Sequence, residues 1–317
     1  MEQKYFLSAD GKSQIAYYIF DEGIKNPRAI LQISHGMKET MNAYLPFVDF
    51  FSKHGIVVVG NEDLGHGNSS TSKETDGFFA DKDGDKCVVR DLNTMSKIAK
   101  ERFPNTPIFM FGHSMGSFFA RYYASLFPNE VDGFIFCGTS GKVKGTGFGL
   151  KMMGLLKKTK GAHTHLAFID NIMTKKYFRY IKNPISNYEW VTSDLNFLLK
   201  NDWDNKSTMA FSVGAYYDMV KVLLYVNKKK WAKRLNKSTP FLLVSGAQDP
   251  VGQYGNGVCD VYRLMEEQKI NSIDLILYGT ARHQPSYEVD SIRTKFFVDM
   301  LNWIEDKVNK LNANNNA

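Results

Sequence analysis

The sequence predicts an α/β fold, in which a mostly parallel β-sheet carries helices on both faces and is interrupted by one helical insert. Two observations support this prediction. Short β-rich apolar runs alternate with longer stretches of helical period along most of the 317 residues. Between Gly138 and Pro240 this alternation stops, so about a hundred residues separate two successive strands.

Eight strands are expected, each an apolar run bounded by turn residues. The first two, residues 5–7 and 15–20, flank Asp10-Gly11 and predict an antiparallel hairpin at the edge of the sheet. The other six are continuous apolar runs, which is typical of strands that are buried on both faces. They comprise residues 29–34, 56–60, 107–111, 131–137, 241–245 and 273–278.

Helices are expected between these strands. Apolar residues recur at helical spacing from Val88 to Ala99, and again from Val289 to Val308. The tail, residues 309–317, is polar and rich in asparagine, so we expect it to fray.

The composition is that of a folded protein and excludes several other classes. Hydrophobic residues make up 43% of the chain and charged residues 23%, which is too apolar for a disordered protein. No apolar run reaches the roughly 18–20 residues that cross a bilayer, and no secretory signal pattern is present, so we expect a cytoplasmic location. Cys87, Cys137 and Cys259 lack the spacing of a metal site, so we expect three reduced thiols, no metal and no other cofactor.

The net charge of +7 originates in the insert. Residues 142–237 contain 19 Lys and Arg against 6 Asp and Glu, whereas the rest of the chain has a net charge of −6. Such a basic surface could make peripheral contact with anionic lipid or a phosphate head group, or it could be an ordinary solvated face. No recognised DNA- or RNA-binding module accompanies the lysines, so nucleic acid is not expected as a partner. The sequence does not predict an oligomeric state.

The insert also contains apolar clusters at helical spacing, which include Met152 and Met173. These side chains could line a tunnel for an acyl chain and bind substrate, or they could simply pack the insert onto the rest of the molecule. A long helical insert between two strands is usually a lid or a substrate domain. We therefore expect a core formed by residues 1–141 and 238–317, and a helical cap, or lid, formed by residues 142–237.

The sharpest local signal is Gly112-His113-Ser114-Met115-Gly116, between an expected strand and an expected helix. A serine at such a tight turn adopts a strained conformation, and the flanking glycines let the two backbones approach closely. Its hydroxyl should project at the carboxyl ends of the strands, where open α/β sheets bind ligands. This context predicts that Ser114 is a catalytic nucleophile.

A serine hydroxyl is a weak nucleophile near neutral pH and needs a base, which in turn needs an orienting carboxylate. Asp249 follows the seventh expected strand and His283 follows the eighth, so both should lie at the same edge of the sheet as Ser114. The order Ser, Asp, His along the chain agrees with this assignment. By contrast, Asp132 begins a strand at the opposite edge, and Asp260 falls in the following helix.

Catalysis also requires hydrogen-bond donors for the negative oxygen of a tetrahedral intermediate, typically two backbone N–H groups. One should be the amide of Met115, directly after the nucleophile. The other should come from the loop after the third strand, where we select Met37. Gly36 and His113, beside these positions, are expected to contact substrate.

At these residues the chain resembles the monoacylglycerol lipase and lysophospholipase group of serine hydrolases, in particular its bacterial members, which have the α/β-hydrolase fold. The resemblance implies that Ser114, Asp249 and His283 form the triad and that the amides of Met37 and Met115 form the oxyanion hole. Five stretches carry it: residues 35–39, 63–69, 112–116, 246–252 and 278–283. Residues 190–217 look like the lid sequence of bacterial members.

The chain departs from the group's pattern at two positions. Ser117 follows Gly116 where a second glycine is usual, and Leu64 stands where an arginine is usual before the Gly-His-Gly turn. Neither difference removes a catalytic group.

The expected activity is therefore hydrolysis of a carboxylic ester through an acyl-enzyme, with monoacylglycerol or lysophospholipid as substrate. Three alternatives stay open: a serine aminopeptidase acting on small peptides, a carboxylesterase of small non-lipid molecules, and a protein that only binds a ligand. An aminopeptidase would need an acidic group in the insert to hold the amino terminus of its substrate. A protein that only binds would be expected to lack a triad member, and none is missing from the sequence.

Overall fold

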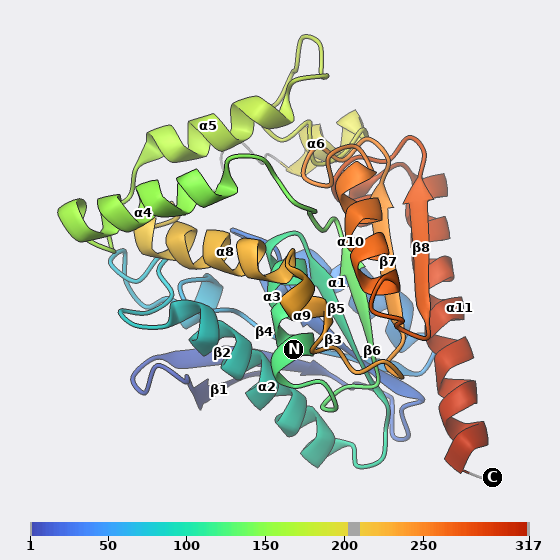
Figure 1. Ribbon diagram of the computed structural model, residues 1–317. Helices are drawn as coiled ribbons and strands as arrows, with labels where there is room; N and C mark the ends of the chain where they lie inside the picture. Colours follow the sequence, from blue (N-terminus) through green and yellow to red (C-terminus); the bar gives the residue numbers. More distant parts are fainter. Residues whose placement is uncertain (1, 202–209, 316–317) are drawn as a thin grey trace.

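An eight-stranded sheet runs through the centre of the molecule (Figure 1). The computed structural model describes residues 2–201 and 210–315, apart from the side chains at positions 167, 170, 171, 173, 174, 201, 314 and 315. The strand order is β1-β2-β4-β3-β5-β6-β7-β8; β1, β2 and β4 are joined by antiparallel pairing, and all other neighbours are parallel. The strands are β1 (Gln3–Leu7), β2 (Gln14–Phe20), β3 (Ala29–Ser34), β4 (Ile56–Asn61), β5 (Ile108–His113), β6 (Gly133–Cys137), β7 (Phe241–Gly246) and β8 (Ile273–Tyr278).

Helices cover both faces of the sheet, which confirms the predicted α/β class. The α-helices are α1 (Leu45–Ser52), α2 (Gly84–Arg102), α3 (Met115–Leu126), α4 (Thr146–Lys160), α5 (Ala167–Tyr177), α6 (Leu195–Asn201), α8 (Val213–Val226), α9 (Lys229–Ala232), α10 (Asn256–Glu266) and α11 (Asp290–Asn315). Three short 3₁₀ turns span Met41–Tyr44, Gly67–Ser69 and Pro285–Tyr287. Among the described residues, no helix combines the length and the apolar character that a membrane crossing requires.

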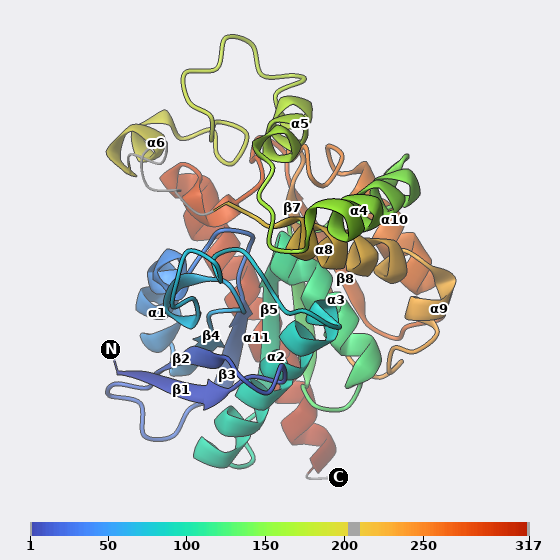
Figure 2. The same cartoon turned by 90° about the vertical axis from the view of Figure 1, so that its left-hand side faces the viewer.

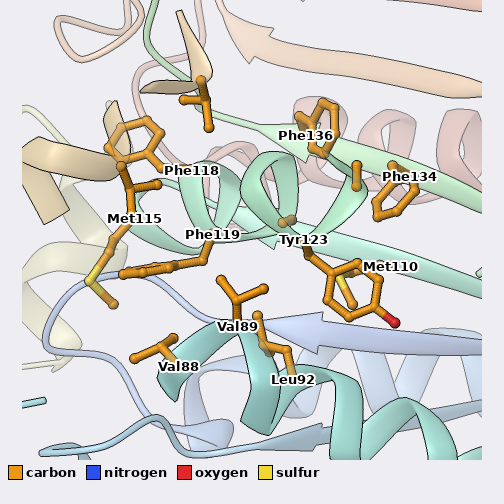
Figure 3. Packing of buried hydrophobic residues seen from close by; sticks show 14 of the residues in the cluster. Val88, Val89, Leu92, Met110, Met115, Phe118, Phe119, Tyr123, Phe134 and Phe136 are labelled. Atoms are coloured by element: carbon orange, nitrogen blue, oxygen red, sulfur yellow. The ribbon is translucent and has the colours of Figure 1, made fainter. Parts of the chain in front are cut away.

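Alternate residues of the central strands build two separate cores. In β5, Met110 packs on the side of α2 and α3, whereas Phe109 and Phe111 pack on the side of α1 and α11. Figure 3 shows the first of these cores, in which Phe119 of α3 and Leu92 of α2 pack together beneath the sheet. Because both faces are covered, β3 to β7 are buried along their whole length, as their apolar sequences predict.

Two predictions about elements are wrong. The strand Ile273–Tyr278 lies at the edge of the sheet, and most of its residues are partly or fully exposed, although its apolar sequence suggested a strand buried on both faces. The tail that was expected to fray, residues 309–317, is helical as far as Asn315, where α11 ends, and residues 316 and 317 lie outside the described residues.

The helices from α4 to α9 lie between β6 and β7 along the chain, where the sequence predicted an insert. We call residues 142–237 the helical insert. In Figures 1 and 2 its helices α4, α5 and α6 lie beyond the carboxyl ends of the parallel strands. Helix α8 packs directly against α2 and α3, and α4 packs on α8. The insert therefore has an inner helix, α8, that belongs to the packed core, and outer helices, α4, α5 and α6, at one end of the sheet.

Both connections of the helical insert meet at Arg121 of α3, which is fully buried. Its guanidinium donates to the carbonyl oxygen of Ser140, after β6, at 2.9 Å, and to that of Val226, at the end of α8, at 2.5 Å. The ring of Trp231 lies 4.6 Å from the guanidinium carbon, and its indole N–H donates to the Arg121 carbonyl. One side chain thus ties the entry and the exit of the insert to α3.

Candidate active site

Ser114 occupies the tight turn between β5 and α3 that the sequence predicts. Its φ of 51° and ψ of −119° are strained for a residue with a side chain, and its N–H donates to the Cys137 carbonyl at 2.9 Å. A Cβ at Gly112 would come within 2.6 Å of the Gly116 carbonyl oxygen, and one at Gly116 would collide with the Ser34 carbonyl. The two glycines are therefore required for the close packing of β5, α3 and β3 at this turn.

Asp249 and His283 form a buried pair at the ends of β7 and β8. The Nδ1 atom of His283 lies 2.9 Å from Oδ1 of Asp249, and both residues are almost completely buried. The carboxylate also accepts hydrogen bonds from the Val251 N–H at 2.8 Å and from the Ser245 hydroxyl at 3.2 Å. A carboxylate oxygen accepts, so Nδ1 of His283 is the donor in this contact, which leaves the Nε2 lone pair available as a base.

Nε2 of His283 is buried and has no hydrogen-bond partner among the described residues. The ring lies against the elbow: its centroid is 4.8 Å from that of His113, and a Cβ at Gly138 would come within 3.0 Å of it. No hydrogen bond between the Ser114 hydroxyl and His283 is present among the described residues. Such bonds are often long in enzymes without substrate and shorten when substrate binds.

The predicted oxyanion donors lie on two different elements. Met115 is the first residue of α3, so its N–H points along the positive end of the helix dipole without an intrahelical acceptor. Met37 lies in the loop after β3, and its side chain is half-buried. In the described part of the chain, neither amide donates to a protein acceptor. Both are thus available to a ligand oxygen.

The loop that carries Met37 is held by a largely buried carboxylate, Glu39, whose side chain is 14% exposed. Its Oε2 accepts hydrogen bonds from the Gly36 N–H at 2.7 Å and from the Tyr44 hydroxyl at 2.6 Å, and its Oε1 lies 3.3 Å from Nδ1 of His113. Burial alone would raise the pKa of Glu39, but the charge of His113 and these hydrogen bonds lower it to about 2. A negative charge is therefore fixed behind the loop and the elbow.

The helical insert supplies the cover over the imidazole. The ring of Trp190 lies 5.1 Å from that of His283, and the ring of Tyr177 lies 4.5 Å from that of Trp190. Two surface hollows of the molecule contain none of the predicted site residues, and one of them is lined only by Lys73, Glu74, His163 and His165. The rings of Trp190 and Tyr177 thus form a tilted stack that lies against the imidazole of His283.

The insert also holds the loop that carries His283. Gln284 donates its N–H to the Val191 carbonyl at 2.9 Å, and the Thr192 hydroxyl donates to the Tyr287 carbonyl at 2.9 Å. The Glu288 carboxylate accepts hydrogen bonds from the backbone of Ser193 at 3.1 Å and from the backbone of Arg282 at 2.7 Å. We call residues 189–193 the anchor segment, because they hold the loop that carries His283.

The residues predicted to bind substrate fall into two groups. Gly36 and His113 are buried and lie next to the proposed oxyanion loop and the nucleophile. Met152 lies on α4 and is 36% exposed, so it does not contribute a fully buried lining; the buried methionine of that helix is its neighbour Met153. Met173 lies on α5, but its side chain is outside the described part of the chain.

Sequence reasoning missed several residues around the site. Glu39 lies within a stretch that carried the family resemblance, but nothing in its spacing indicated a contact with His113. Trp190 and Tyr177 come from irregular or helical parts of the insert, where no periodicity marks the residues that face the imidazole. Only the resemblance of residues 190–217 to a lid sequence pointed to this region.

The order of the strands, with the elbow after β5 and the helical insert after β6, defines the α/β-hydrolase fold. The chain belongs to the α/β-hydrolase family whose model is described as "Serine aminopeptidase, S33", which matches residues 25–290.

Similar proteins of known name are lipases and esterases. The chain is 23% identical over 293 residues to the monoglyceride lipase homolog of Monkeypox virus, covering 90% of this chain and 92% of that protein. It is 21% identical over 316 residues to the monoglyceride lipase of Rattus norvegicus, covering 96% and 90%. A thermostable carboxyl esterase from Bacillus coagulans, solved in complex with glycerol, superposes with a TM-score of 0.88 at 30% identity, covering 97% of this chain and 98% of that chain. The chain is thus an ester hydrolase of the lipase and esterase clade.

Proposed function

We propose that this protein is a serine hydrolase that cleaves carboxylic esters through an acyl-enzyme on Ser114. The observation that carries the proposal is the buried hydrogen bond of 2.9 Å between Asp249 and His283, with the free Nε2 atom beside a strained serine turn. A general base needs one ring nitrogen free to accept a proton, and the contact with Asp249 orients this imidazole so that Nε2 is that nitrogen.

In the proposed first step, Nε2 of His283 takes the proton of the Ser114 hydroxyl while Oγ attacks the ester carbonyl. The N–H groups of Met37 and Met115 stabilise the resulting oxyanion. When the tetrahedral intermediate collapses, His283 gives its proton to the departing alcohol. A water molecule, deprotonated by His283, then attacks the acyl-enzyme and releases the acid, and Ser114 recovers its proton. The Asp249 carboxylate stabilises the imidazolium in both halves of the reaction.

The substitution Ser114→Ala tests this proposal, because it removes the attacking oxygen and leaves the fold unchanged. We expect kcat/KM for a p-nitrophenyl ester to fall by a factor on the order of 10⁴ or more. Covalent labelling by a fluorophosphonate probe should be lost as well. Ser125→Ala, a change of another buried serine on α3, is the matched control and should keep both properties. Full turnover in Ser114→Ala would refute the assignment.

For the substrate, we propose a monoester with a medium or long acyl chain, such as monoacylglycerol or lysophospholipid. Two observations support this choice: the curated relatives include monoglyceride lipases, and the similar Bacillus coagulans esterase was solved with glycerol. Hydrolysis should be faster for a long-chain monoacylglycerol or lysophospholipid than for a short acetyl ester. Equal rates across the series of chain lengths would remove the lipid proposal and favour a carboxylesterase of small molecules.

The family description names a second candidate function, aminopeptidase activity. Such an enzyme needs a carboxylate that is free to bind the amino group of the substrate. The described acidic side chains of the insert are all occupied or buried: Glu189 pairs with Arg282, Asp194 caps α6 and Asp218 packs against Gly84. Because none of these carboxylates is free to bind an amino group, an ester is favoured over a peptide as the substrate. An aminoacyl arylamide in the same assay distinguishes the two, since an aminopeptidase would cleave it faster than the esters.

We further propose that residues 142–237 act as a cap domain whose outer face contacts an anionic lipid surface. On α4, Phe148 is 74% exposed and Leu155 is 62% exposed, and the last turn of this helix carries Lys157, Lys158 and Lys160. Exposed apolar side chains beside lysines are typical of helices that lie in a membrane interface. Vesicles with phosphatidylserine should bind the protein in a sedimentation assay, and neutral vesicles or high salt should abolish binding. Equal binding to both vesicle types would contradict the charge-dependent contact.

A further inference from the structure

Two buried histidines lie beneath the loop that carries Met37, and the proposed proton transfers use neither. His35 directly follows β3, and His66 lies in the glycine-rich turn after β4. Both residues are completely buried, and their ring centroids are 4.8 Å apart. Their ring nitrogens are all engaged by the backbone, which reveals where each proton resides.

In His35, Nε2 lies 2.9 Å from the backbone nitrogen of Asp63. An amide N–H can only donate, so Nε2 must present a lone pair and the ring proton must be on Nδ1. Nδ1 lies 2.8 Å from the Gly36 carbonyl oxygen and therefore donates to it. This carbonyl belongs to the peptide unit that joins Gly36 to Met37, and the N–H of the same unit is the proposed oxyanion donor. The imidazole thus fixes the plane of the peptide that carries the donor.

His66 makes the corresponding contact on the other side of Met37. Its Nε2 accepts the Lys38 N–H at 3.3 Å, and its Nδ1 donates to the Leu64 carbonyl at 3.0 Å. The Lys38 N–H belongs to the peptide unit that follows Met37. Burial and the nearby His35 lower the pKa of His66 to about 3, so its ring is neutral at neutral pH. Only the neutral ring can accept the amide.

We propose that His35 and His66 are positioning residues that hold the two peptide units on either side of Met37 and thereby aim its N–H at the developing oxyanion. The inference rests on the proposed function, because it concerns the oxyanion donor of that reaction. Each imidazole acts in the same way, with a proton on Nδ1 and an acceptor at Nε2.

The turn around His66 is built to present this ring. Gly65 and Gly67 have φ values of 74° and 45°, and a Cβ at Gly65 would come within 2.5 Å of the Phe78 backbone nitrogen. The rings of Phe79 and Phe211 lie 6.3 and 5.7 Å from the His66 ring and enclose it. A side chain at either glycine would displace the turn, so the Gly-His-Gly pattern places the acceptor beneath the loop.

An ion pair between His35 and Asp63 is the competing explanation for the first histidine. The nearest carboxylate oxygen of Asp63 is 3.9 Å from Nε2, which exceeds hydrogen-bond distance, and the Asp63 N–H already points at that nitrogen. A proton on Nε2 would oppose this N–H. The geometry therefore favours the neutral ring.

The test compares two substitutions at one site. In His66→Gln, the side-chain oxygen can reach the former Nε2 position and accept the Lys38 N–H, whereas in His66→Leu it cannot. Complete loss of an oxyanion donor lowers kcat by about 10²–10³-fold. In His66→Leu the Met37 N–H is still present but is no longer held in the correct orientation, so we expect kcat to fall by about 10–100-fold. KM should stay within about twofold. His66→Gln should recover most of the lost kcat. Rates are normalised to sites labelled by the fluorophosphonate, so that unfolded protein does not count.

A second readout distinguishes aiming of the donor from general packing. An alkyl trifluoromethyl ketone forms a tetrahedral adduct with a negative oxygen on the serine, whereas the corresponding alcohol binds without an adduct. The His66→Leu variant should bind the ketone more weakly by about the same factor as its loss of kcat, and the alcohol with unchanged affinity. Equal effects on the two ligands, or equal kcat losses in the Gln and Leu variants, would overturn the proposal.

The unmodified protein provides a measurement that does not depend on the folding of variants. In ¹⁵N spectra of histidine-labelled protein at pH 7, His35 and His66 should both show the neutral tautomer with the proton on Nδ1. A proton on Nε2, or an imidazolium, in either ring would overturn the inference. The proposed function is tested separately: if the unmodified protein shows no Ser114-dependent ester hydrolysis, that function fails, whatever the tautomers are.

Discussion

Glu39 is a largely buried carboxylate whose surroundings favour its charged form. Its pKa is about 2 in the folded protein, compared with the usual 4.5, because the charge of His113 and three hydrogen-bond donors outweigh the effect of burial. The unfolded chain therefore binds a proton to this group at a higher pH than the folded protein does. The stabilisation by Glu39 is fully present above about pH 5 and is lost as the pH falls toward 2.

We therefore predict that Glu39→Gln lowers the free energy of unfolding by up to about 3 kcal/mol at pH 7 and by much less at pH 3. Urea unfolding of both proteins at pH 7, 5 and 3 measures this difference. Glu101→Gln, which changes an exposed carboxylate, should leave the pH dependence unaltered. If the difference between Glu39→Gln and the unmodified protein stays the same at all three pH values, the assigned pKa is wrong.

At the scale of single residues, the sequence predicted those positions that a local rule determines. Ser114 is marked by two glycines that the close packing of three elements requires, and Asp249 and His283 are marked by their places after adjacent parallel strands. Glu39 and Trp190 follow no such rule. Their contacts with His113 and His283 depend on how loops distant in the chain fold over one another, and neither periodicity nor spacing encodes this.

Helix α8 presents a buried carboxylate to the first turn of α2. Oδ2 of Asp218 is buried without a hydrogen-bond partner among the described residues, and the space it fills exists because Gly84 has no Cβ. Burial and the nearby charge of Asp85 raise the pKa of Asp218 to about 7. Here the folded protein binds the proton more tightly than the unfolded chain, so the free energy of unfolding falls as the pH rises from about 4 to 7.

Replacing this carboxylate by an amide should therefore stabilise the contact between α8 and α2 at high pH. We predict that Asp218→Asn raises the free energy of unfolding by about 2–4 kcal/mol at pH 8 and has little effect at pH 4. Thermal or urea unfolding at the two pH values gives the comparison, with the exposed Asp260→Asn on α10 as control. Destabilisation at pH 8 would show that the ionised Asp218 has a favourable partner.

At the scale of elements, the apolar runs located all eight strands to within two residues at either end. For β3 to β7 the reason is burial on both faces, which leaves few polar positions in a strand. The same pattern failed to predict the exposure of β8. Strand β8 keeps an apolar sequence because helices such as α10 and α11 cover part of it. The composition of a single strand does not reveal its position in the order of the sheet.

Arg121 links the two connections of the helical insert to the body of the molecule. No carboxylate of the described residues pairs with the buried guanidinium; it donates to Thr139, Ser140, Val226 and Asn227, and burial lowers its pKa to about 9. The planar group can reach both connections at once, which a lysine ammonium cannot.

We predict that Arg121→Lys lowers the free energy of unfolding by about 2–3 kcal/mol, because carbonyl groups at the two connections lose their donor while remaining buried. Hydrogen exchange should increase at residues 138–141 and 226–231. Arg102→Lys, a change of an exposed arginine at the end of α2, is the control and should have no measurable effect on either quantity. Unchanged exchange at both connections in Arg121→Lys would contradict the linking role.

For the whole molecule, the interruption in strand rhythm predicted the presence and the place of the helical insert but not its internal division. From the sequence, the insert is predicted as one helical region without further division. In the structure, α8 packs directly against α2 and α3, whereas α4 packs on α8, and this distinction depends on contacts between helices far apart in the chain.

The anchor segment limits how much of the helical insert can be exchanged between relatives in order to change substrate specificity. Residues 189–193 belong to the insert by position, yet they hold the loop of His283 through hydrogen bonds of Val191, Thr192 and Ser193. In a chimera that received an entire foreign insert, the His283 loop would lose these hydrogen bonds and would depend on contacts with the new segment. An exchanged segment that begins at residue 142 should end before residue 189, so that the recipient keeps its own anchor segment and the hydrogen bonds that hold the His283 loop.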